Sequence, residues 1–176
     1  MTAAFVVRSG GQTGVDRSAL DVALGMGLPY RGWCPAGGWA EDLPVPPGLL
    51  RHYPLLTETP SSDPRQRTAW NVRDSDATLL VIPADGLAES AGTSFTRACA
   101  ELVFVKPLHV SSLEDPGSAD NAIEWLQECL RLRESSFVLN VAGPRESESP
   151  GIYERSREHL VRVFDATGEP GRTSKK

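Results

Sequence analysis

Cysteine and histidine are scarce in this sequence of 176 residues. It contains three of each, and the cysteines, Cys34, Cys99 and Cys129, are far apart with no C-x-x-C pair. An odd number of isolated cysteines argues against a disulfide framework and against a thiolate zinc site. The histidines are equally scattered, so we predict no metal centre built from the chain's own side chains.

Long hydrophobic runs are lacking as well. The longest, such as residues 77–83, fall far short of the ~20 residues that a membrane-spanning helix needs. No basic segment precedes the strand-like run that begins at Ala3, so a secretory signal peptide is not expected. These observations predict a cytoplasmic protein that has no membrane partner.

Positive charge is in short supply. The chain has 18 Lys and Arg against 23 Asp and Glu, which gives a formal net charge of −5 and disfavours nucleic acid as a partner. The length and the hydrophobic content of 40% are typical of one globular domain. We predict that this domain covers residues 1–166. Residues 167–176 contain no apolar anchor and are expected to form a flexible tail.

Strand-like and helix-like segments alternate along the chain. We expect strands at residues 3–7, 30–33, 77–82, 107–110 and 137–142, and helices near 15–26, 63–74, 94–104, 118–132 and 152–163. The run at residues 3–7 is continuously apolar, which is typical of a strand covered on both faces. The sequence therefore predicts an α/β fold: a Rossmann-like, doubly wound and mostly parallel sheet flanked by helices. Residues 29–57, rich in Pro, Gly and Trp, show no long periodicity; apart from the strand at 30–33, they are expected to form a long segment over a site.

The first candidate binding loop follows the first strand. Glycines there would let backbone amides approach an anion, most often a phosphate, at the N-terminus of a helix. The candidate residues are Ser9, Gly10, Gly11, Gln12, Thr13 and Gly14. The pattern is neither G-x-G-x-x-G nor a P-loop, and a plain strand-to-helix turn is the alternative. Thr13 and Asp16 are expected to form a capping box, and Gly14→Val is expected to weaken binding but leave the fold largely intact.

Two further loops carry polar residues after strands, where ligands of open parallel sheets bind. After the strand at 77–82, Gly92, Thr93 and Ser94 open a helix and would form a second amide-rich cradle. After the last strand, the candidates are Asn140, Gly143 and Arg145. Arg145 is a potential bidentate anion ligand, and its alternative role is an ion pair with Glu146 or Glu148.

Asn71 and Arg73 stand just before the strand at 77–82 and are further candidates for ligand contact. The alternative for this polar segment is a fixed network of ion pairs that does not touch the ligand. No catalytic residue is predicted. Glu41, Asp42, Asp74 and Glu101 are the acids available as a general acid or base, and Cys34 is either a structural thiol or a soft ligand.

Several motifs resemble those of the molybdenum cofactor carrier family. They are Ser-Gly-Gly-Gln-Thr-Gly-Val-Asp-Arg (9–17), Gly-Trp-Cys-Pro (32–35), Ala-Glu-Asp (40–42), Leu-Thr-Glu-Thr (56–59), Trp-Asn-Val-Arg-Asp-Ser-Asp (70–76) and Asn-Val-Ala-Gly-Pro-Arg-Glu-Ser (140–147). The resemblance covers about residues 5–164. It implies a Rossmann-like sheet related to the cytokinin-activating phosphoribohydrolases. It also implies binding, storage or transfer of molybdenum cofactor, a phosphorylated pterin. A homo-oligomer and partners among molybdoenzymes or cofactor-synthesis proteins are further implications.

The sequence departs from the phosphoribohydrolase pattern at the second loop. Those relatives carry an acidic residue after a glycine-threonine turn, whereas Gly92-Thr93 is followed here by Ser94, Phe95 and Thr96, and Ala91 replaces a glycine. The departure favours a binding protein over a hydrolase. An enzyme or sensor acting on a nucleotide-derived ligand is the first alternative, and an interaction module with empty loops is the second.

Overall fold

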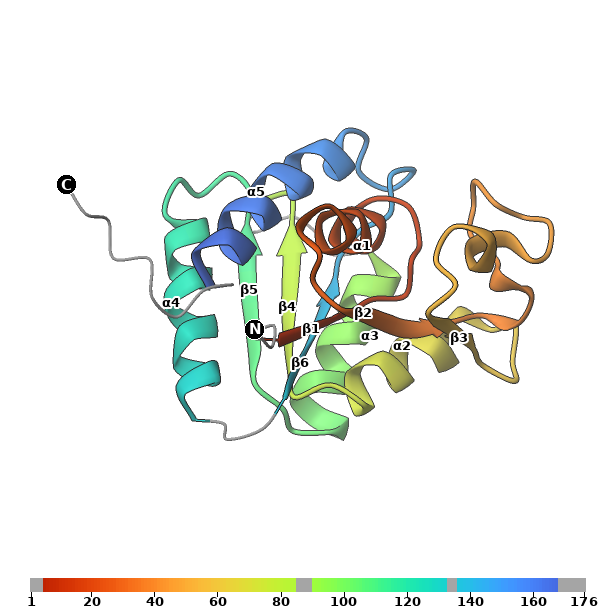
Figure 1. Ribbon diagram of the computed structural model, residues 1–176, viewed down its shortest axis with the longest axis horizontal. Helices are drawn as coiled ribbons and strands as arrows, with labels where there is room; N and C mark the ends of the chain where they lie inside the picture. The colour runs from red at the N-terminus through yellow and green to blue at the C-terminus, as the bar shows by residue number, and fades with distance from the viewer. Residues whose placement is uncertain (1–4, 85–89, 133–135, 168–176) are drawn as a thin grey trace.

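The computed structural model describes residues 5–84, 90–132 and 136–167, and Figure 1 shows the arrangement of their helices and strands. The strands are β1 (Phe5–Arg8), β2 (Tyr30–Cys34), β3 (Leu56–Glu58), β4 (Ala77–Ile82), β5 (Leu108–Ser112) and β6 (Phe137–Ala142). The helices are α1 (Val15–Met26), α2 (Pro64–Arg73), α3 (Ala91–Ala98), α4 (Ser118–Arg131) and α5 (Ile152–Thr167), and α3 continues in a π-helical turn over Cys99–Val103. Apart from Thr167, which ends α5, the predicted tail lies outside the described residues.

All six strands form one parallel sheet in the order β3-β2-β1-β6-β4-β5. The last strand of the chain, β6, enters between β1 and β4: Asn140 is in register with Arg8 on one side and Thr78 on the other. The predicted Rossmann-like, parallel α/β fold is thus confirmed. The direction of chain progression reverses beside β1, and such a switch point opens a crevice at the carboxyl ends of the strands.

Helices cover both faces of the sheet, and two separate hydrophobic clusters show it. The larger cluster joins α1, α4 and α5 to one set of strand side chains, including Val7, Leu79 and Leu139. A small cluster of Val72, Cys99 and Ala100 joins α2 to the π-helical turn after α3. Figure 1 shows α1 beside α5 and α2 beside α3, in agreement with their packing. Alternation along a strand sends successive side chains to opposite faces, so both faces of the central strands are buried.

The predicted helix boundaries hold where local chemistry defines them. Pro64 occupies the first turn of α2, and the Asp63 carboxylate accepts a hydrogen bond from the Arg65 amide at 2.9 Å. Gly27, in the left-handed conformation, ends α1. The predicted capping box is wrong, because the N-cap residue is Gly14 and it receives no side-chain hydrogen bond.

Two other elements differ from the sequence-based expectation. Residues 29–57 contain a strand beyond the expected one at 30–33, because Leu56 begins the short strand β3, which pairs with β2. The helix expected from residue 94 begins three residues earlier, at Ala91, because the Ser90 hydroxyl caps it by accepting from the Thr93 amide at 3.2 Å. None of the helices among the described residues combines the length and the hydropathy of a membrane span.

Candidate functional site

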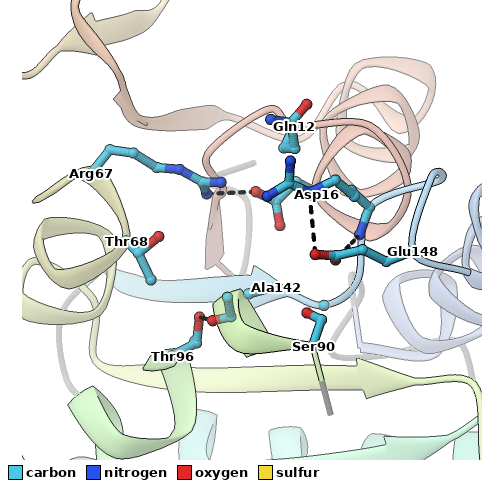
Figure 2. Close-up of a pocket in the computed structure, with 11 residues that line it drawn as sticks. Gln12, Asp16, Arg67, Thr68, Ser90, Thr96, Ala142 and Glu148 are labelled. Carbon is cyan, nitrogen blue, oxygen red and sulfur yellow. Dashed lines mark hydrogen bonds and ion pairs between the residues drawn. The ribbon is translucent and has the colours of Figure 1, made fainter. Parts of the chain in front are cut away.

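A polar hollow opens at the carboxyl edge of the sheet, where β1 and β6 end. The loop after β1, the loop after β6, and the N-terminal halves of α2 and α3 surround it (Figure 2). Its lining residues are Gln12, Asp16, Arg67, Thr68, Ser90, Gly92, Thr96, Ala142, Gly143, Arg145 and Glu148. It encloses about 340 Å³, open solvent at its mouth included.

A smaller hollow of about 180 Å³ shares the residues Asp16, Arg67, Thr68, Thr96 and Ala142 with the first and is also open to solvent. Its remaining lining residues are Gly10, Asn71, Asn140 and Val141. Because the two hollows share five lining residues, we treat them as one cleft. The larger hollow is called its outer part and the smaller hollow its inner part. The inner part is lined by amide and hydroxyl side chains, which suits hydrogen bonding more than hydrophobic contact.

The centre of the cleft is an ion pair between Arg67 of α2 and Asp16 of α1. The Arg67 Nη1 lies 2.8 Å from the Asp16 Oδ2, and the two side chains are only 14% and 5% exposed. Figure 2 shows the guanidinium pointing at the carboxylate across the hollow. Burial raises the pKa of Asp16 above its ordinary value, although Arg67 acts in the opposite direction. The Arg67 Nε is buried and finds no hydrogen-bond partner among the described residues.

Gly10 allows Arg67 to reach this position. A Cβ built on Gly10 would stand 2.0 Å from the Arg67 Nη1, which no real pair of atoms tolerates. The missing side chain therefore makes room for the guanidinium. The glycine and the arginine are 57 positions apart, so sequence inspection offered no sign of their contact.

The other residues of the first loop are used inside the protein. The Gln12 Oε1 accepts hydrogen bonds from the amides of Thr13 and Glu41, both at 3.0 Å. Gly11 and Gly14 have φ values of 73° and 75°, and Gly11 fits beneath the side chain of Leu49. The Thr13 amide already donates to Gln12 and is therefore not free to bind an anion. The hypothesis of an anion site made of backbone amides requires a free amide at this position. In this loop Gly10 and Gln12 line the cleft, whereas Ser9, Gly11, Thr13 and Gly14 do not.

Glu41 connects the long segment after β2 to the loop after β6. Its carboxylate accepts from the Thr13 hydroxyl, and from the Ser147 hydroxyl at 2.6 Å. Burial tends to raise the pKa of Glu41, but the hydrogen bonds from Ser147 and Thr13 outweigh it and lower that pKa below its ordinary value. Glu41 is thus held as a carboxylate in a structural role.

The other three acids that the sequence offered are also paired. Asp42 accepts two hydrogen bonds from Arg17, at 2.9 and 3.0 Å. Asp74 is bound by Arg73 and by the Trp33 indole, and Glu101 lies 3.9 Å from Arg97. The acids that line the cleft are instead Asp16 and Glu148, which sequence reasoning missed. Asp16 had a signal, since it lies inside the Gly-rich motif of residues 9–17.

The N-terminus of α3 does not offer the set of free backbone amides that the sequence suggested for binding an anion. The Thr93 amide is capped by Ser90, and Thr93 itself is buried at 1% exposure. Gly92 lines the outer cleft and faces open space, whereas Ser94 is exposed and outside the lining.

Arg145 lies at the mouth of the cleft, between two carboxylates. Its Nε is 3.4 Å from Glu148 and its Nη1 is 3.8 Å from Glu41. The ion pair with Glu148 is one of the two alternatives that the sequence raised. Glu146 turns away and accepts from the amides of Gly151 and Tyr153 at the start of α5. Because its side chain is 32% exposed, Arg145 stays accessible to a ligand that competes with Glu148.

Asn71 and Arg73 both lie near the end of α2, but only Asn71 lines the cleft. The Asn71 amide forms two hydrogen bonds with the backbone of Trp33, at 2.8 and 2.9 Å, and lines the inner cleft. Arg73 stacks over the Trp70 ring at 4.5 Å and pairs with Asp74. It does not line the cleft, so the structure places it in the ion-pair network that was the alternative for this segment.

No group of three or more His, Cys, Asp or Glu side chains within residues 5–84, 90–132 and 136–167 could hold a metal ion. Cys34 is buried, and its thiol points at the Thr57 carbonyl at 3.6 Å. Burial and the nearby Glu58 raise the pKa of this thiol to about 11, which makes it a poor nucleophile at neutral pH.

Comparison with known proteins places this site in a family. Residues 7–164 match the model of the circularly permutated YpsA SLOG family. The chain belongs to that family. Its fold also matches the crystal structure of a "Putative molybdenum carrier protein" from Syntrophus aciditrophicus SB, with a TM-score of 0.76 and 36% identity over 93% of this chain and 97% of the other. A search of curated proteins gave no match.

The topology of this SLOG-family chain is compatible with a permutated order. Circular permutation is tolerated where the two ends of a domain lie close together, and the rings of Phe5 in β1 and Phe164 in α5 are 5.3 Å apart. Here the first strand, β1, pairs directly with the last, β6, with Phe5 in register with Phe137. The same adjacency brings the loops after these strands together at the cleft.

The predicted site residues of this SLOG-family chain divide into two groups. The fold gathers Gly10, Gln12, Asn71, Gly92, Asn140, Gly143 and Arg145 around the cleft. It places Ser9, Gly11, Thr13, Gly14, Arg73, Thr93 and Ser94 elsewhere. Asn140 lies on the floor, where its amide donates to the Thr78 hydroxyl at 3.3 Å. Gly143 allows β6 to pass β4, since a Cβ there would stand 2.3 Å from the Val81 carbonyl oxygen.

Proposed function

We propose that this protein binds the phosphate end of a small molecule in the cleft, and that the molecule is molybdenum cofactor. The observation that carries the proposal is the pair of guanidinium groups, Arg67 and Arg145, that line one hollow from different elements. Arg67 is buried, and its Nε is left without a partner among the described residues. A buried donor without an acceptor costs about 1–3 kcal/mol, so a ligand oxygen that reached this N–H would stabilise the site.

Phosphate suits this donor set. Guanidinium groups bind phosphate oxygens through short, charge-assisted hydrogen bonds. The hydroxyls of Thr68, Ser90 and Thr96 also line the hollow, but each already donates inside the protein, to the Pro64 carbonyl, the Thr93 hydroxyl and the Gly92 carbonyl respectively. The cleft also lies at the switch point of a parallel sheet, which is where ligands of such folds bind.

The choice of cofactor rests on the family resemblance and on the name of the similar protein from Syntrophus aciditrophicus. The hollow is open to solvent and too small for the whole of a pterin with its metal centre. We infer that the phosphate enters and that the pterin extends toward the mouth, past Arg145. We further propose that the protein releases the cofactor to molybdoenzymes. We also propose that the chain forms a homo-oligomer and acts in the cytoplasm.

The test is to purify the protein from a host that makes the cofactor and to identify the co-purifying molecule by mass spectrometry. We expect a phosphorylated pterin on the wild type and much less on Arg67→Lys, which keeps the charge but not the fork of donors. Arg162→Ala removes an arginine that pairs with Asp120 outside the cleft lining and serves as the matched control. A wild-type protein that carries no phosphorylated compound would contradict the proposal.

A specific observation supports a second candidate, an enzyme acting on a nucleotide-derived ligand. The sequence lacks an acid after Gly92-Thr93, but the fold puts the buried carboxyl of Asp16 into the cleft. Burial raises the pKa of Asp16, a property common in general acids. Incubation with nucleoside monophosphates distinguishes the two functions. Release of free base at about 1 per second or faster, abolished in Asp16→Asn, would favour the enzyme.

A further inference from the structure

The charged side chains that line the outer cleft balance one another. Arg67 and Arg145 supply two positive charges, and Asp16 and Glu148 supply two negative ones. The two carboxylates differ in their contact with water. The Asp16 side chain is 5% exposed and lies beside Arg67, whereas the Glu148 side chain is 31% exposed at the mouth. An anion that reaches Arg67 therefore also meets a buried carboxylate that water does not screen.

The Asp16 carboxylate beside Arg67 should affect the binding of an oxyanion differently depending on whether that oxyanion carries a proton. A fully ionised oxyanion has only acceptor oxygens, and so has the Asp16 carboxylate, so their contact in a buried site is repulsive. An oxyanion that keeps one proton can donate it in a hydrogen bond to Asp16 and accept from Arg67 at the same time. The discrimination holds for Asp16 as a carboxylate, the form that pairs with Arg67, because a protonated Asp16 would donate to either kind of oxyanion.

We propose that Asp16 is a specificity-determining residue that admits a protonated phosphate group to Arg67 and rejects tetrahedral oxyanions that carry no proton, such as sulfate and molybdate. This inference rests on the proposed phosphate site. It identifies the recognised group as the phosphate of the ligand and not as free molybdate. For a protein similar to one named a molybdenum carrier, that distinction decides which molecule is carried.

The chemistry of the two kinds of anion makes the selection effective near neutral pH. The second pKa of a phosphate monoester is about 6, so a proton is available close to physiological pH. Sulfate and molybdate are doubly ionised there. A site built to receive a hydrogen bond from a ligand hydroxyl strongly rejects the analogue that lacks it.

The charged groups that face Asp16 come from three elements. Arg67 reaches it from α2, and Arg17 is the next residue on α1. Arg145 and Glu148 line the same hollow from the loop after β6. Arg17 is committed to Asp42 by two hydrogen bonds, so it contributes a distant field and not a contact for the ligand.

The test measures the binding of inorganic phosphate, sulfate and molybdate to the full chain by titration calorimetry at pH 6.5. We expect the wild type to bind phosphate at least about tenfold more tightly than either of the other anions. In Asp16→Asn, sulfate and molybdate should gain affinity until the three anions agree within about threefold. Glu148→Gln removes a charge at the exposed mouth, and it should strengthen all three together without changing their ratio.

A second measurement needs no variant and so does not depend on whether Asp16→Asn folds. Wild-type affinity for a phosphate monoester such as glycerol phosphate should weaken as the pH rises from 6.5 to 8.5, because the monoester loses its only proton at about pH 6. Inorganic phosphate keeps one proton as HPO4²− over this range and should weaken less. Equal wild-type affinities for the three anions, or an unchanged ratio in a folded Asp16→Asn, would overturn the inference but leave the proposed phosphate site standing. If none of the three anions binds, the phosphate site and the inference both fail.

Discussion

Gly14 lies directly against the backbone of Pro144. A Cβ built on Gly14 would stand 2.4 Å from the Pro144 carbonyl oxygen, and that same oxygen accepts a hydrogen bond from the Val15 amide at 3.2 Å. The glycine thus lets the start of α1 meet the loop after β6 backbone to backbone. Because Asp16 follows on α1 and Arg145 follows Pro144, this contact joins two of the segments that line the cleft.

The first prediction concerns this contact, and it corrects the expectation that Gly14→Val leaves the fold intact. Gly14→Ala should lower the free energy of unfolding by at least about 2 kcal/mol, because φ is 75° and the new Cβ meets a rigid carbonyl. Chemical denaturation measures the change. Gly25→Ala is the control: no atom lies within 4 Å of a Cβ at this helical position, so stability should rise by about 0.5–1 kcal/mol. Equal midpoints for wild type and Gly14→Ala would refute the steric account.

The second prediction concerns the buried pair of Arg67 and Asp16. Arg67→Met should lower stability by about 3–5 kcal/mol, because it leaves the Asp16 carboxylate buried without its cation. The double variant Asp16→Asn/Arg67→Met should lose much less than the sum of the two single changes. Unfolding by urea of all four proteins gives the coupling. Additive losses would mean that the pair is not an energetic unit.

The third prediction concerns Arg145 and the kind of ligand. Arg145→Ala should weaken binding of the phosphorylated cofactor about 10- to 150-fold, the equivalent of about 1.5–3 kcal/mol, and matter less for a pterin that lacks the phosphate. The pairing with Glu148 at 3.4 Å favours the lower end, since the ligand must compete with that carboxylate. Titration of both proteins with both ligands measures the ratio. A ratio that the substitution leaves unchanged would remove Arg145 from the phosphate site.

The fourth prediction concerns pH and the histidine of α5. Burial lowers the pKa of His159 to about 4 from an ordinary 6.5, with His109 and Arg162 acting in the same direction. Between about pH 4 and pH 6.5, His159 is protonated in the unfolded chain but stays neutral in the folded protein. The contribution of His159 to stability is thus complete above pH 6.5 and is lost as the pH falls toward 4.

The measurement is the free energy of unfolding at pH 7.5 and pH 5.0. Wild type should lose up to about 2 kcal/mol more than His159→Leu over this interval, at 1.36 kcal/mol for each pH unit below 6.5. The variant provides the control, because every other titrating group is common to both proteins. Parallel losses would show that His159 titrates normally in the folded state.

Much of the fold could be read from the sequence because its signals are local. Largely apolar runs mark β4 and β6 as strands covered on both faces, and Pro64 and Gly27 mark helix ends through their own backbone preferences. The three residues of β3 escaped prediction, because their pairing with β2 and not their composition makes them a strand.

The cleft shows the same division. The sequence by itself determined that polar, Gly-containing loops would follow β1 and β6 at one edge of a parallel sheet, because parallel strands must end on the same side. Only the tertiary structure decided that β6 inserts beside β1, that Arg67 crosses 51 positions of sequence to reach Asp16, and that Gly10 makes room for it. Such contacts depend on strand order and on packing between distant segments, which no local pattern of residues specifies.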